Sequence, residues 1–64
     1  MNDGKFVENM WLGNRELIMR RLSTGWFEVL DGDNNYKVAF KGDCSECEEF
    51  MKQQYIEYEE NRIG

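Results

Sequence analysis

The sequence contains no histidine and no proline, and only two of its 64 residues are cysteines. The absence of histidine removes the commonest general acid–base catalyst and a frequent zinc ligand. Two cysteines cannot provide the several disulfides that stabilise small secreted domains. No segment approaches the run of about 20 apolar residues that spans a membrane, and the first residues, MNDGKFVENMW, lack the apolar run of a signal peptide. We therefore expect a cytoplasmic protein that is not an enzyme.

Basic residues are also few, because eight lysines and arginines accompany 13 aspartates and glutamates, for a formal net charge of -5 at pH 7. A negatively charged chain repels phosphate backbones, which argues against direct binding of nucleic acid. The same charge suits a larger partner protein with a basic surface. A chain this short forms one small domain, residues 1–64, whose core of about ten side chains leaves no room for a deep pocket. We expect no cofactor.

Three segments have apolar residues at the every-second-residue spacing of β-strands: residues 16–22, 26–30 and 36–41. A short turn or a polar loop separates each segment from the next, so an antiparallel meander is expected. The residues that we assign to the core side of this sheet are Phe27, Val29, Tyr36, Val38 and Phe40. In the first strand, Leu17 and Met19 share one side, and Glu16, Ile18, Arg20 and Leu22 share the other.

The N-terminal segment, residues 5–12, has apolar residues at both helical and strand spacing. Gly13 and Asn14 suit a tight hairpin turn, and they would equally end a short helix. We favour a strand that pairs with residues 15–22, and a helix remains the alternative. The sheet therefore has three or four strands.

The C-terminal segment is predicted to be a helix that runs to about Asn61. Asp43 is a suitable N-cap, and Glu46 stands three residues later, as in a capping box. The side chains predicted to face the sheet are Cys44, Cys47, Phe50, Met51, Tyr55 and Tyr58. The fold class is therefore α+β, with one helix packed on one face of an antiparallel sheet.

The sequence CSEC at residues 44–47 stands after a strand and at the start of a helix, which is where thioredoxin-like proteins carry a C-x-x-C motif. That fold requires more chain after the motif and a cis-proline beside it, and neighbouring glutamates disfavour a thiolate. Two thiols without histidine supply only half of a zinc site. We interpret Cys44 and Cys47 as packing residues. A thiol-redox protein, or a homodimer bridged by a four-thiolate zinc site, remains the alternative.

Two surfaces are candidates for binding a partner. The first is the outer side of the helix, named here the acidic face: Glu46, Glu49, Gln53, Ile56, Glu57 and Glu60. The second is the face of the sheet away from the helix, named here the open face, where we expect Trp26 and Leu30. The alternative for the open face is that the N-terminal segment, with Phe6, Met10 and Trp11, folds over it.

Residues 26–56 resemble a ββα unit of small acidic proteins encoded by bacteriophages. The resemblance lies in the strand WFEV, the loop DGDNN, the strand YKVAFKG and the capped helix DCSECEEF. It implies a protein that acts in the host cytoplasm by binding and blocking a host enzyme. We therefore predict a protein-binding module that inhibits or modulates a larger nucleic-acid-handling enzyme. A structural accessory subunit of an assembly and a homodimer remain alternatives.

Overall fold

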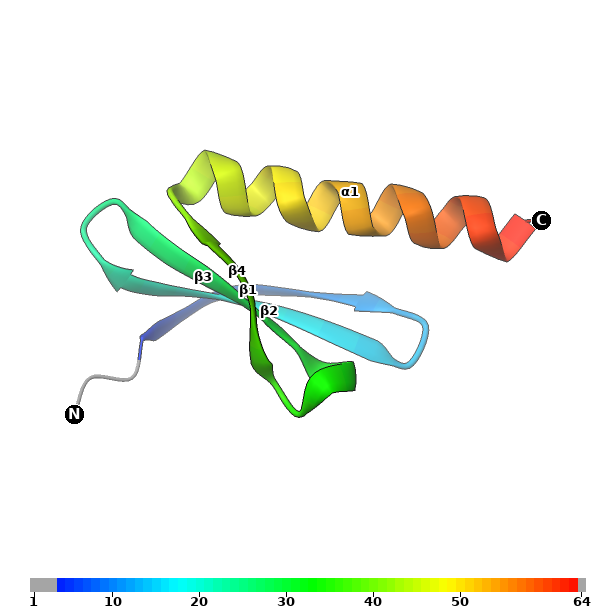
Figure 1. The fold of residues 1–64 in the computed structure, drawn as a ribbon, viewed down its shortest axis with the longest axis horizontal. Coiled ribbons are helices and arrows are strands. Elements are labelled where there is room, and N and C mark those ends of the chain that lie inside the picture. The colour runs from blue at the N-terminus through cyan, green and yellow to red at the C-terminus, as the bar shows by residue number, and fades with distance from the viewer. Residues whose placement is uncertain (1–3, 64) are drawn as a thin grey trace.

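The computed structural model describes residues 4–63, which form an open antiparallel sheet followed by one long helix (Figure 1). The strands are β1 (Lys5–Leu12), β2 (Arg15–Ser23), β3 (Trp26–Asp31) and β4 (Lys37–Gly42), and the helix is α1 (Cys44–Ile63). A single 3-10 turn, η1 (Gly32–Asn34), connects β3 to β4. The strands lie in the order β1-β2-β3-β4, so β1 and β4 are the edges. The predicted α+β meander with a C-terminal helix is confirmed, with four strands.

The N-terminal segment is a strand, as we favoured, and it pairs along most of its length with β2. Gly13 forms the turn with a φ of 67°, a left-handed value that glycine adopts without steric cost. Because Phe6, Met10 and Trp11 belong to this edge strand, they do not fold over the open face. That alternative is wrong, since the segment extends the sheet and the backbone groups on one side of it pair with β2.

The core lies between α1 and the face of the sheet that it crosses. Its buried apolar side chains are Leu12, Leu17, Met19, Val29, Cys47 and Met51. Leu17 and Met19 alternate with partly exposed residues along β2, as the strand period requires. The C-terminal half of α1 reaches the β1–β2 hairpin, where a Cβ atom on Gly13 would lie 3.0 Å from the Tyr58 hydroxyl. The helix therefore crosses the sheet from β4 to β1 (Figure 1).

Two residues that we assigned to the core, Tyr36 and Val38, are exposed by 45% and 46%. Phe40 is opposite Val29, but Val38 is opposite Leu30, so Ala39 is an extra residue in β4. Such a β-bulge reverses the alternation of faces on one side of it, which places Val38 on the open face.

Tyr36 precedes β4 with a φ of 59°, which is rare for an aromatic residue. Its backbone nitrogen donates to the Asp31 carbonyl at 2.8 Å, and its hydroxyl donates to Glu16 at 2.8 Å. These bonds hold the ring beside the β3–β4 connection and away from the core.

The predicted capping box starts the helix. Asp43 Oδ1 accepts a hydrogen bond from the Glu46 backbone nitrogen at 2.8 Å, and Glu46 Oε1 accepts one from the Asp43 nitrogen at 2.9 Å. The helix ends at Ile63, two residues beyond the predicted end. Within residues 4–63, no helix combines the length and apolar character needed to cross a membrane.

The helix side that contacts the sheet differs in one residue from the prediction. Cys47 and Met51 are buried and Tyr58 packs against them, but Tyr55 is 46% exposed. Tyr55 is eight residues from Cys47, which rotates it by about 80° around the helix axis. It therefore lies at the margin of the buried stripe.

A charged cluster joins two strands to the helix. Arg15 donates to both carboxylate oxygens of Asp31, through Nε at 3.0 Å and Nη2 at 2.9 Å. The same Nη2 lies 3.4 Å from the Gln54 side-chain oxygen on α1. The hydrogen bonds from Arg15 lower the pKa of Asp31 below its ordinary value, against the opposing effect of burial.

Replacing Asp43 with alanine should lower the free energy of unfolding by about 1 kcal/mol, because the helix loses its N-cap. Urea denaturation followed by circular dichroism measures this loss. Ser45→Ala is the control, since Ser45 is an exposed residue in the same turn. Equal losses in both variants would contradict a specific role for the cap.

The Asp31 carboxylate should make stability depend on pH in the acid range. Its folded pKa is lowered, so its contribution is present above about pH 4 and is lost as pH falls through the folded pKa. At about pH 6, Asp31→Asn should be less stable than the wild type by about 1 kcal/mol. The difference should be smaller at about pH 2, because protonation of the wild-type carboxylate as the pH falls removes its pairing with Arg15.

Urea titrations at both pH values test this expectation. Asp33→Asn is the control, because Asp33 is exposed and forms no ion pair with the residues of the described chain. A pH-independent difference between wild type and Asp31→Asn would show that the ion pair is not its source.

Candidate functional site

The acidic face is exposed along its whole length. All six predicted residues are solvent-exposed: Glu46, Glu49, Gln53, Ile56, Glu57 and Glu60. The helix carries six glutamates and two basic residues, and one of these, Arg62, pairs with Glu59 at 2.7 Å. Among residues 4–63, no lysine or arginine forms a salt bridge with a glutamate of the acidic face. The face therefore presents negative charge to solvent.

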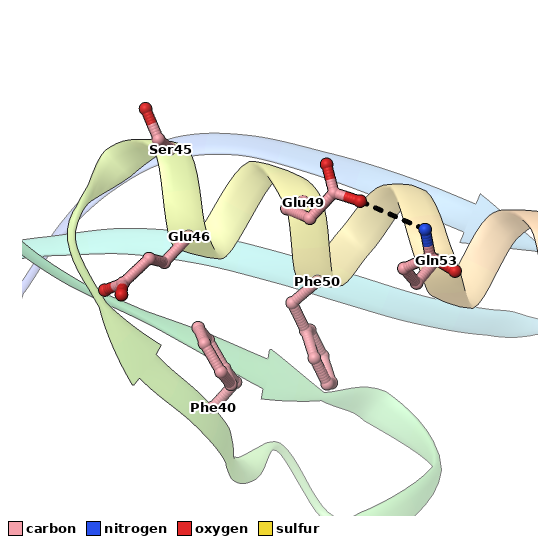
Figure 2. Close-up of a pocket in the computed structure, with 6 residues that line it drawn as sticks. All are labelled: Phe40, Ser45, Glu46, Glu49, Phe50 and Gln53. Atoms are coloured by element: carbon pink, nitrogen blue, oxygen red, sulfur yellow. Dashed lines mark hydrogen bonds between the residues drawn. The ribbon is translucent and has the colours of Figure 1, made fainter.

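A groove between α1 and β4 includes three residues of the acidic face, Glu46, Glu49 and Gln53. The groove has a volume of about 510 Å³, and its lining residues are Phe40, Ser45, Glu46, Glu49, Phe50 and Gln53. Figure 2 shows Phe50 reaching down from the helix beside Phe40 of β4. We name this feature the α1–β4 groove. The remaining residues of the acidic face, Ile56, Glu57 and Glu60, do not line it.

The apolar part of the groove is a stacked pair of aromatic rings. The ring centroids of Phe40 and Phe50 are 4.9 Å apart, and their planes differ by 8°. Both side chains pack against the core and keep part of their surface exposed. The sequence assigned both rings to the core. The signal that could have revealed their exposure is the position of Phe40 on the last strand, which has a neighbour on only one side.

Hydrogen bonds orient the polar residues of the groove. The side-chain nitrogen of Gln53 donates to Glu49 Oε2 at 3.0 Å, one helical turn away (Figure 2). Glu46 is held at the start of the helix by the capping box, through its Oε1. Each carboxylate therefore keeps one oxygen that hydrogen-bonds to no other described residue. The groove combines an aromatic floor with a negatively charged rim.

Of the two residues predicted for the open face, only Trp26 is accessible to a partner. Trp26 is 46% exposed, whereas Leu30 is only 7% exposed and offers little area to a partner. The sequence missed Trp11, which is 59% exposed and lies opposite Glu16 in the sheet register. Because α1 packs on one face of the sheet only (Figure 1), these tryptophans remain accessible.

A charged row interrupts the apolar residues of the open face. Glu28 is 4% exposed and accepts hydrogen bonds from Arg20 through Nε at 2.9 Å and Nη2 at 2.5 Å. Lys41 is opposite Glu28 on the other neighbouring strand. Arg20 satisfies this carboxylate, so the row leaves no unpaired buried charge for a ligand.

The two thiols lie at the start of the helix. The Sγ of Cys44 is 3.7 Å from Glu48 Oε2, and the buried Sγ of Cys47 is 3.8 Å from the Gly42 carbonyl. Burial raises the pKa of both thiols, and Glu48 raises that of Cys44 further. Within residues 4–63, no three cysteine, aspartate or glutamate side chains are grouped as metal ligands would be. These surroundings favour a packing role over thiolate chemistry.

The raised pKa values should make both thiols slow to react with a disulfide reagent such as DTNB near neutral pH. Glu48→Gln should increase the rate at Cys44 about threefold, because removing the negative charge lowers the thiol pKa and increases the thiolate fraction. Glu57→Gln, a carboxylate far along the helix, is the control and should leave the rate unchanged. A thiol that reacts faster than free cysteine would restore the redox hypothesis.

The chain was also compared with known proteins. No protein-family model, no curated protein and no solved structure matches it. The function must therefore be inferred from the geometry and charge of the acidic face, the α1–β4 groove and the open face.

Proposed function

We propose that the chain is a protein-binding module that inhibits or modulates a larger nucleic-acid-handling enzyme by covering its basic surface. The observation that carries the proposal is the acidic face, whose exposed glutamates have no cationic partner among the described residues. Basic surfaces that bind phosphate backbones attract such a face for the same electrostatic reason. A phage-encoded protein that acts in the host cytoplasm is consistent with this activity.

The shape of the chain supports occlusion as the mechanism. The molecule measures 42 × 23 × 15 Å, and the last turns of α1 extend past the β1–β2 hairpin (Figure 1). From Glu46 to Glu60 the helix presents carboxylates over about 21 Å, at 1.5 Å per residue. A helix of this length covers a stretch of the partner's basic surface that would otherwise contact several phosphates.

Ile56 gives the acidic face a point of apolar contact. It is 36% exposed and precedes Glu57 on the helix. Charge complementarity steers association and selects the partner, whereas buried apolar area stabilises the complex. We therefore assign recognition to the glutamates, and part of the affinity to Ile56.

The double variant Glu49→Lys/Glu57→Lys should lose the partner without losing stability. Both residues are exposed and make no ion pair among residues 4–63, so the thermal unfolding midpoint should stay unchanged. The measurement is recovery of bound protein from host lysate on the immobilised chain, by mass spectrometry, at low and high salt. We expect a single nucleic-acid-handling enzyme that is lost at high salt and in the variant.

The matched control is Glu8→Lys/Asp33→Lys, which changes the net charge equally at exposed positions outside the acidic face. It should retain most of the binding. Intact binding in the Glu49/Glu57 variant would refute the proposal. A salt-resistant complex that Trp26→Ser abolishes would move the interface to the open face and also refute it.

A further inference from the structure

We propose that the α1–β4 groove holds an arginine side chain of the partner protein, with its aliphatic stem on Phe40 and Phe50 and its guanidinium against Glu49. This inference rests on the proposed function, because it names the part of the basic partner that the acidic face recognises. It adds a defined binding site for one side chain to the acidic face, whose other glutamates act through charge over the length of the helix.

The residues that line the groove require a ligand side chain that is apolar along its stem and positively charged at its end. The stacked rings of Phe40 and Phe50 form an apolar floor, and Glu46 and Glu49 stand at the rim. A purely apolar side chain would bury the rings and leave the carboxylates without a partner. Lysine and arginine have both an apolar stem and a cationic head.

Arginine matches this groove better than lysine. Its planar guanidinium carries several N–H donors, so one of them can reach the Glu49 oxygen that Gln53 leaves free while the stem stays on the rings. Glu49 is held by Gln53, so its carboxylate is already oriented before a ligand arrives. Preorientation lowers the conformational entropy that binding removes. The volume of about 510 Å³ also accommodates the residues on either side of the arginine.

The edge of β4 argues against a different mode of binding, in which an extended segment adds to the sheet as a fifth strand. The bulge at Ala39 disrupts regular pairing along this edge, and Lys37 and Lys41 are exposed on the same strand. Bulges and lysines are the devices that protect edge strands from pairing with other chains. The groove beside this edge therefore receives a side chain, and the strand itself stays unpaired.

The experiment is a titration of the ¹⁵N-labelled chain with the peptide acetyl-Gly-Arg-Gly-amide, followed by amide chemical shifts. We expect shifts confined to the residues that line the groove. The same peptide with lysine should bind about threefold more weakly, and that with citrulline about tenfold more weakly, because citrulline has the shape of arginine without its charge. A peptide with norleucine that binds as well as arginine would overturn the proposal in favour of an apolar anchor.

Two variants locate the site. Glu49→Gln should weaken the arginine peptide about threefold, and Phe50→Leu should weaken it by a similar factor through loss of the stacked ring. Glu60→Gln is the matched control, because Glu60 lies on the acidic face outside the groove, and it should bind as the wild type does. Equal binding by Glu49→Gln and wild type would refute the assignment. Because Glu49 is exposed, Glu49→Gln removes no core packing and should leave the fold intact.

The outcomes separate this inference from the proposed function. If arginine peptides cause no shifts in the groove while Glu49→Lys/Glu57→Lys still abolishes partner binding, the anchor is wrong and the acidic-face function stands. If groove shifts change on dilution of the protein alone, the occupant is a second copy of the chain, and the proposal is overturned. If the peptide binds but the charge-reversed double variant keeps its partner, both the proposed function and the anchor fail, because that variant lacks the Glu49 carboxylate that would hold the partner's arginine.

Discussion

The packing of α1 across one face of the sheet is the constraint on which every other feature of this protein depends. Cys47 and Met51 bury their side chains against Leu17, Met19 and Val29, and these contacts form the centre of the core. A chain of this length exposes much of its surface, so only a few side chains can be buried in its core. The stability of the domain and the direction of its helix therefore come from the same few contacts.

The direction of the helix creates the groove. The capping box starts α1 directly after β4, and the Arg15–Asp31 pair, which also reaches Gln54, links the sheet to the middle of the helix. Because α1 crosses from the edge strand toward the β1–β2 hairpin (Figure 1), it diverges from β4. Phe40 and Phe50 meet where the two elements separate, and the helix side above them carries Glu46 and Glu49.

Sequence patterns and the structure agree best where a residue depends on its neighbours along the chain. The capping box requires only Asp43 and Glu46 at the correct spacing, and the buried side of β2 requires only Leu17 and Met19 two residues apart. They differ where a residue depends on another element. Val38 is exposed because a bulge at Ala39 reverses its face, and Leu30 is buried although it lies on the open face.

By itself, the sequence determined the α+β meander, the capped helix and the row of exposed glutamates, because each follows from local periodicity and charge. Only the tertiary structure decided that Phe40 and Phe50 stack beside part of that row. Their contact joins residues from an edge strand and a helix, whose relative angle is set by core packing and by no local signal. The acidic face was therefore predictable from the sequence, whereas the groove required the fold.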